Sequence, residues 1–299
     1  MLPEMRAEAA GRRSKKLRIT IVGAGNLANV LAGSLHASGY RIDQIIARER
    51  SESLLHAGRL AARVGATAVS SRKVQISADV IWFCVPDRAI REAAAAIESS
   101  TDWSGKVALH SSGTFTSDEL GPLRRRGAVV ASAHPLMTFV HGSKPKLAGV
   151  PFAIEGDRKA ARIARTLVIN LGGTAYSIRA EDKPAYHAWG TLASPLFTAL
   201  LATCEQVAAA AGVKRNAAKK KMLPMLKQTL ANYEALDAAG TFSGPIVRGD
   251  VETVKRHLGV LRKAPVARAV YIALAQAALA YLPAKNKDSL KRVFNPHSL

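Results

Sequence analysis

The stretch that decides the fold is Leu17-Arg-Ile-Thr-Ile-Val-Gly23-Ala-Gly25-Asn-Leu-Ala28. Its apolar run is typical of a buried strand, and residues 26–38 have the pattern of a helix. The turn between them matches G-x-G-x-x-G/A: Gly23 permits the tight turn, Gly25 lets a phosphate approach the backbone, and Ala28 lets helix and strand pack closely. Because a helix N-terminus attracts anions, this segment predicts a site for the pyrophosphate of a dinucleotide.

Beyond that turn, short apolar runs alternate with helical stretches up to residue 178. This alternation predicts a Rossmann-type, doubly wound α/β domain with a mostly parallel sheet and helices on both faces. Asp87 is expected to cap the helix that follows the fourth strand. The further strands are expected at 42–47, 66–69, 80–85, 106–110, 129–133, 152–155 and 174–178.

After residue 180 the strand signals stop and long helical patterns follow, so an all-helical domain is expected there. A kink is expected at Pro195, inside the helical pattern 181–211. Further helices are expected at 214–239, 250–262 and 265–281. The predicted organisation is a disordered basic tail at 1–16, a dinucleotide-binding domain at 17–179, a helical domain at 180–285 and a C-terminal tail at 286–299.

The composition narrows the class of protein. The 299 residues carry a formal net charge of +21, but the basic clusters are not interleaved with aromatic residues, so a nucleic-acid platform is disfavoured. No secretory signal is recognised, and no stretch is judged long and apolar enough to cross a membrane. Cys84 and Cys204 are both expected to be buried and reduced. A cytoplasmic protein is the expectation.

The end of the second strand bears on which dinucleotide binds. It has the sequence Ala47-Arg48-Glu49-Arg50-Ser51, whereas an NAD site places an acidic residue there for the ribose hydroxyls. Arg48 and Arg50 favour the 2′-phosphate of NADP, although both could be mere surface charge. At the end of the fourth strand, Val85-Pro86 is expected to line the nicotinamide ribose. The predicted cofactor contacts are Gly23, Gly25, Asn26, Leu27, Arg48, Arg50, Ser51, Cys84, Val85 and Pro86.

Several short motifs make the chain resemble a family of Rossmann-like proteins with a helical domain of unknown function, usually described as NADP oxidoreductases. This group is related to the 6-phosphogluconate dehydrogenases, the β-hydroxyacid dehydrogenases and the pyrroline-5-carboxylate reductases. The resemblance implies the fold and the cofactor class, NADP, but no substrate. The motifs are Gly23-Ala-Gly25-Asn-Leu, Val85-Pro86-Asp87, His110-Ser-Ser-Gly113, His134-Pro135, Lys183-Pro-Ala-Tyr-His187 and Gly244-Pro-Ile-Val-Arg-Gly-Asp250.

Lys183 and His187 are the candidate catalytic residues. They are four residues apart, so they share a helix face. The resemblance to the β-hydroxyacid dehydrogenases implies that a lysine at the position of Lys183 is the general acid or base. In those enzymes an asparagine follows one turn later, where this chain has His187. The alternative remains open that Lys183 merely starts a helix and that His187 packs against Trp189. The chain also has Ser194-Pro195 where this group often shows Ser-Asn.

Two further groups are candidate substrate contacts. Ser111, Ser112 and Gly113 follow the fifth strand and His134 ends the sixth, so they should share the ligand-binding edge of the sheet. In the loop before residue 251, Arg248 could hold an acidic substrate and Asp250 should cap a helix, or the two could form a salt bridge in a purely structural loop. No Ser-His-Asp order or metal-ligand spacing is recognised, so neither a hydrolase nor a metal site is expected.

The sequence thus favours an NADP-dependent oxidoreductase that transfers hydride between NADP(H) and a small carbonyl, imine or hydroxy-acid substrate in an interdomain cleft. The alternatives are a non-catalytic NADP-binding sensor and, less favoured, a nucleic-acid-binding protein. The Ala-rich helices of the second domain predict a homodimer formed through that domain.

Overall fold

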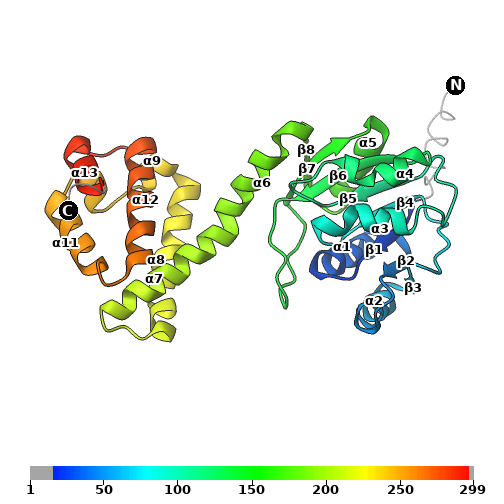
Figure 1. Ribbon diagram of the computed structural model, residues 1–299, viewed down its shortest axis with the longest axis horizontal. Coiled ribbons are helices and arrows are strands. Elements are labelled where there is room, and N and C mark those ends of the chain that lie inside the picture. Colours follow the sequence, from blue (N-terminus) through cyan, green and yellow to red (C-terminus); the bar gives the residue numbers. More distant parts are fainter. Residues whose placement is uncertain (1–15, 296–299) are drawn as a thin grey trace, which may run out of the picture. The chain divides into compact units, whose positions relative to one another are not determined.

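The computed structural model describes residues 16–295, which form two compact units, Met1–Thr191 and Leu192–Leu299 (Figure 1). The division falls twelve residues after the boundary expected at 179, because the sequence pattern changes at the first long helix whereas the start of that helix packs with the first unit. Of the predicted basic tail, only Lys16 lies within the described residues.

The first unit contains one sheet of eight strands in the order β3-β2-β1-β4-β5-β6-β7-β8. All neighbouring strands are parallel except β6 and β7, which pair antiparallel. The predicted doubly wound, mostly parallel fold is therefore confirmed. The strands are β1 Arg18–Val22, β2 Arg41–Ala47, β3 Thr67–Ser70, β4 Val80–Phe83, β5 Val107–His110, β6 Val129–Pro135, β7 Pro151–Gly156 and β8 Thr174–Ser177.

Helices cover both faces of this sheet, which explains why its central strands are apolar throughout (Figure 1). All four residues of β4 are buried, for example. One face packs against α1 (Asn26–Ala37), α2 (Ser51–Val64) and α5 (Arg158–Asn170). The other packs against α3 (Ile90–Ala96) and α4 (Gly121–Arg125). The last helix of the unit is α6 (Lys183–Thr191).

Asp87 does not cap the helix after β4, as the sequence had predicted. The residues Asp87–Ala89 form a 3₁₀ turn that precedes α3, and no side-chain cap is formed at its start. The Asp87 carboxylate instead accepts a hydrogen bond from the hydroxyl of Ser112, 2.7 Å away. The residue thus links the loops that follow β4 and β5.

The second unit is helical throughout its described part. Its core consists of apolar side chains from α11, α12 and α13. The predicted C-terminal tail is wrong over α13, because Leu290 and Phe294 are spaced four apart and bury one helix face in that core. The helices are α7 Phe197–Ala210, α8 Arg215–Ala235, α9 Ala238–Thr241, α10 Pro245–Arg248, α11 Val251–Leu261, α12 Pro265–Tyr281 and α13 Lys287–Phe294.

The helical stretch Ala180–Ala210 contains the irregularity expected at Pro195, a π-helical turn at Leu192–Leu196. By length and composition its 31 residues could cross a membrane, so the expectation that no stretch qualifies is wrong. This length and composition do not by themselves indicate a membrane protein, because helices of soluble proteins also have them. None of its apolar window is buried. Cys204 lies in this stretch and is exposed, whereas Cys84 is buried as predicted.

Candidate functional site

The glycine turn between β1 and α1 has the geometry that the motif requires. Gly23 has a φ of +106°, and a Cβ there would lie 2.7 Å from the carbonyl oxygen of Cys84. Gly25 precedes α1 without any side-chain cap, and a Cβ on it would meet nothing within 4 Å. The first amides of α1, at Asn26 and Leu27, thus face open space, which suits a bound phosphate.

A cavity of about 420 Å³ opens beside this turn. Of the predicted cofactor contacts, it is lined by Gly23, Gly25, Arg48, Cys84, Val85 and Pro86. Asn26, Leu27, Arg50 and Ser51 are not among its lining residues. Asn26 donates its side-chain amide to the carbonyl of Phe139, and Arg50 precedes the first residue of α2.

The cavity also has polar lining residues that the sequence analysis did not single out: Ser53, His56, Ser71, Arg88 and Glu92. Ser53 and His56 are three apart on α2, so the i, i+3 pattern beginning at the end of β2 could have revealed them. A glycine turn, an uncapped helix N-terminus and basic residues at the end of β2 fit a dinucleotide that carries a phosphate on its ribose.

Lys183 lies in a second cluster at the carboxyl ends of β5 and β6. Its side chain is 1% exposed, and the ammonium donates to the Ser112 carbonyl at 2.9 Å and to the Ser132 hydroxyl at 2.6 Å. The carboxylate of Glu155 lies 3.8 Å away. Burial lowers the pKa of Lys183 to about 8, opposed by the carboxylates of Glu155 and Asp87. Three acceptors therefore surround a group with three protons to donate.

Glu155 and Ser132 were missed in the sequence because they are single polar residues inside apolar strands. Glu155 is 8% exposed and accepts hydrogen bonds from the amide of Ser117 at 2.6 Å and from its hydroxyl at 3.0 Å. With Lys183 they form a buried polar network that ties the start of α6 to the sheet.

Two histidines in this cluster are held in the neutral form. The Nδ1 of His110 accepts from the amide of Ser112 at 3.0 Å, and its Nε2 lies 2.9 Å from the carbonyl of Thr116, so the proton is assigned to Nε2. Burial lowers the pKa of His110 to about 4. Burial, together with the positive charge of Lys183, lowers the pKa of His134 to about 3.

His134 and His187 meet at Gly113. A Cβ on Gly113 would lie 2.6 Å from Cδ2 of His187 and 2.9 Å from Nε2 of His134, and the two ring centroids are 6.2 Å apart. The other ring nitrogen of His134, Nδ1, lies 2.7 Å from the hydroxyl of Tyr186. Burial raises the pKa of Tyr186, so its hydroxyl keeps its proton, which has two acceptors in reach, Nδ1 at 2.7 Å and the His134 carbonyl at 3.4 Å; we assign it to the nearer Nδ1. The Nε2 proton of His134 then points toward Gly113.

The remaining predicted substrate contacts are placed differently. The hydroxyl of Ser111 accepts from the indole of the buried Trp82 at 2.9 Å. Arg248 and Asp250 belong to the second unit. Asp250 caps α11 as predicted, accepting from the amide of Thr253 at 3.0 Å. Within residues 16–295 no ion pair joins Arg248 to Asp250, and no three His, Cys, Asp or Glu side chains are grouped as metal ligands.

The first unit is thus a dinucleotide-binding domain: the strand order around β1, the glycine turn and the cavity at the carboxyl ends of the strands define that class. Residues 18–109 match the family described as NADP oxidoreductase, coenzyme F420-dependent, and residues 150–278 match a domain of unknown function (DUF2520). The family matches indicate an NADP-dependent oxidoreductase whose substrate is unknown, and the predicted resemblance and cofactor are confirmed.

Solved structures share the fold. A protein of Bacteroides fragilis described as an NADP oxidoreductase is 22% identical, with a TM-score of 0.73, covering 88% of this chain and 97% of its own. A Thermotoga maritima protein is 23% identical, with a TM-score of 0.68 and coverages of 87% and 96%. An imine reductase from a Pseudomonas species is 20% identical, with a TM-score of 0.59 and coverages of 89% and 94%. No curated protein matches the sequence significantly.

Proposed function

We propose that the protein uses NADPH to reduce a small carbonyl or imine compound, or runs the reverse oxidation of a hydroxy acid, beside Gly113. The observation that carries this proposal is the pair of histidine rings that border one glycine next to the cofactor cavity. Neighbouring residues link the cavity to Gly113. Pro86 lines the cavity, and the next residue, Asp87, accepts a hydrogen bond at 2.7 Å from Ser112, which precedes Gly113.

NADPH, when bound, supplies the hydride. On the protein side, His134 would donate its Nε2 proton as a hydrogen bond to the oxygen or nitrogen of the substrate, because the neutral ring has that proton free. His187 is exposed, so it would give a proton to the same atom and recover one from solvent. Gly113 has no side chain, and a Cβ there would collide with both rings, so the substrate atom would sit beside the two rings and not between them and Gly113.

Lys183 has a different part in this proposal from the one that the resemblance implies. Its ammonium donates hydrogen bonds to two protein acceptors and lies 3.8 Å from the Glu155 carboxylate, and its side chain is 1% exposed. We therefore assign the proton transfer to His187, and treat Lys183 as a positioning residue that fixes α6, and with it His187, against the ends of β5 and β6.

The test is NADPH oxidation with a panel of carbonyl and imine compounds. His187→Gln should lower turnover by about a hundredfold, the lower range for the loss of a general acid, without weakening NADPH binding. The matched control is His36→Gln, an exposed histidine at the far end of α1, which should leave turnover unchanged. Tight NADPH binding without oxidation of any compound would favour the sensor.

We also propose that the second unit forms a homodimer through α7 and α8. The helix α7 buries none of its residues within the described chain, although it is mostly apolar. Exposed apolar side chains include Met225 at 65% and Leu230 at 57% on α8, and Leu196 at 50% just before α7. A second copy covering them would also account for the apolar stretch Ala180–Ala210 in a cytoplasmic protein.

Sedimentation analysis tests this assembly. The wild type should sediment as a dimer, and Met225→Lys should shift it toward monomer, because an ammonium would be buried in the apolar interface. Val266→Lys is the control, since Val266 is 74% exposed on α12 outside the proposed surface. A monomeric wild type at all concentrations would contradict the assembly and leave the proposed reaction untouched.

A further inference from the structure

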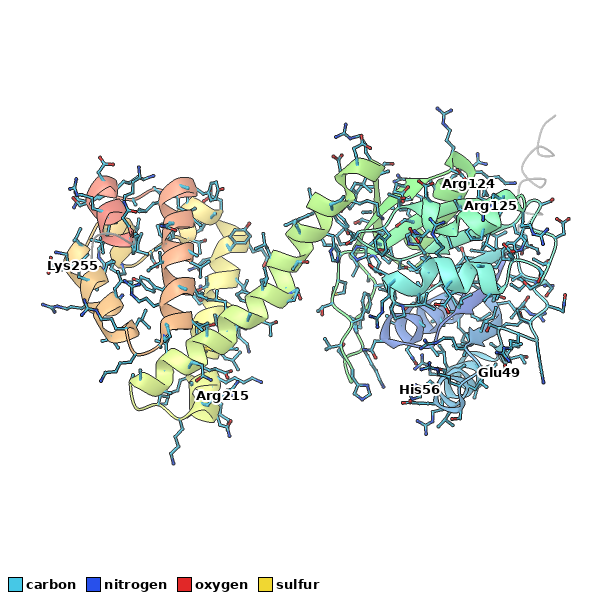
Figure 2. All side chains as sticks on the ribbon, viewed as in Figure 1. Glu49, His56, Arg124, Arg125, Arg215 and Lys255 are labelled. Carbon is cyan, nitrogen blue, oxygen red and sulfur yellow. The ribbon has the colours of Figure 1, made fainter. Side chains whose placement is uncertain are left out.

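The cavity has a polar end where β2 finishes. Four lining residues gather there: Arg48 follows β2, Ser53 and His56 lie on α2, and Ser71 follows β3. Each can donate a hydrogen bond and none is acidic, which suits the 2′-phosphate of the ribose. Figure 2 labels His56 on α2 in this part of the first unit.

Glu49 is an acidic residue at this end of β2, and it directly follows Arg48. In dinucleotide sites an acidic residue after the second strand binds the ribose hydroxyls of NAD and repels the extra phosphate of NADP. Yet the carboxylate of Glu49 is paired with Arg72, Nη1 to Oε2, at 3.0 Å. Glu49 therefore has a cationic partner that competes with a ribose for its carboxylate.

The backbone places this partner. Strands β2 and β3 run parallel with Ala47 opposite Ser70, and the amide of Ser71 donates to the carbonyl of Ala47 at 2.9 Å. The two loops that follow therefore leave the sheet side by side, which brings Arg72 next to Glu49. The register of the sheet therefore places the two side chains within reach of each other.

We propose that Arg72 is a specificity-determining residue, which selects NADP over NAD by holding Glu49 away from the ribose. This inference rests on the proposed use of NADPH. With the Glu49 carboxylate neutralised, Arg48 and the three other donors are left to the 2′-phosphate. The side chains are 81% and 42% exposed for Arg72 and Glu49, so the effect is moderate and not absolute.

Binding of NADPH and NADH to the full chain, followed by nicotinamide fluorescence, provides the test. Arg72→Met should raise the Kd for NADPH by about fivefold, the upper range for an exposed ion pair, and lower the Kd for NADH. The double variant Arg72→Met/Glu49→Gln should recover the NADPH affinity, because the released carboxylate is gone. Arg41→Met is the matched control, an arginine 76% exposed and paired with Asp43 at the opposite end of β2.

Each outcome decides between distinct ideas. If Arg72→Met binds both nucleotides as the wild type does, the inference is wrong while the proposed function stands. If the double variant stays as weak as Arg72→Met, then Arg72 contacts the phosphate itself and the role of Glu49 is refuted. If the wild type binds neither nucleotide, the proposed function fails before the inference is reached.

Discussion

The two glycines of the β1–α1 turn should fail in opposite ways when each is replaced by alanine. Gly23→Ala puts a side chain on a residue with a φ of +106° and 2.7 Å from the backbone oxygen of Cys84. That oxygen cannot move freely, because the Cys84 amide is bonded to Val22 at 2.8 Å. Backbone strain and overpacking together should cost about 3–5 kcal/mol of unfolding free energy.

Gly25→Ala should leave the fold nearly intact. Gly25 has a φ of −77°, which alanine adopts without strain, and its Cβ would meet nothing within 4 Å. The loss of glycine at a helix N-cap should cost at most about 1 kcal/mol. The added methyl would instead occupy the space that a phosphate needs, so NADPH affinity should fall by about tenfold or more, the value of one lost charge-assisted hydrogen bond.

Urea unfolding and NADPH titration of both variants separate the two effects. The expected result is an unstable Gly23→Ala protein and a stable Gly25→Ala protein with weak cofactor binding. A Gly23→Ala protein as stable as the wild type would refute the described turn. A Gly25→Ala protein that binds NADPH normally would show that the pyrophosphate does not approach this backbone.

Three further predictions concern stability and the histidine pair. The pKa of His110 is about 4 in the folded protein, below its ordinary value of 6.5, so the unfolded chain binds more protons between pH 4 and 6.5. The free energy of unfolding should therefore fall by about 3 kcal/mol as the pH drops from 6.5 to 4. In His110→Gln, the urea midpoint should depend less on pH over this range. Gly113→Ala should displace the His187 and His134 rings and abolish turnover while NADPH binding persists in the fluorescence titration. Asp250→Ala removes the cap of α11 and should cost about 1 kcal/mol in urea unfolding.

The sheet could be predicted from the sequence because its strands are buried on both faces and separated by clear helical patterns. Phe152–Glu155 and Thr174–Ile178 are expected as strands and appear as β7 and β8, with no bound shifted by more than one residue. The pattern does not predict whether two neighbouring strands pair parallel or antiparallel. The antiparallel pairing of β6 and β7 follows from the chain between them, which contains no helix. The apolar pattern of a short strand does not indicate the direction in which the strand runs in the sheet.

In the helical unit, the periodicity of apolar residues does not always predict which side chains are buried. Because α7 is apolar around most of its surface, burial of Cys204 was a natural expectation, yet the described residues leave it exposed. A helix of this kind can be covered from any side, so its sequence does not say which side chains are buried. The opposite case is α13. The spacing of Leu290 and Phe294 shows a narrow apolar helix face in the sequence itself, although a C-terminal tail is the expectation for these residues.

The candidate site could be predicted in its membership more than in its roles. The motifs pointed to Ser112, Gly113, His134, Lys183 and His187, and the structure brings all five together. Their roles depend on Glu155 and Ser132, which a sequence shows only as polar residues in strands. Glu155 and Ser132 lie 28 and 51 residues before Lys183 in the chain, and their contacts decide whether the Lys183 ammonium can donate a proton. No local sequence pattern shows such contacts.

Lys183 illustrates why this matters for the chemistry. A lysine can act as a general acid only if one of its protons can reach the substrate. Here the ammonium donates to the Ser112 carbonyl and the Ser132 hydroxyl and lies 3.8 Å from the Glu155 carboxylate. Its lowered pKa, about 8, is the kind of shift that marks catalytic lysines, yet burial alone produces it. Lys183→Met would leave the Glu155 carboxylate buried and unpaired, so lost stability, and not lost proton transfer, should dominate that variant. Loss of turnover in Lys183→Met therefore identifies a catalytic lysine only if the variant also unfolds at the wild-type urea concentration.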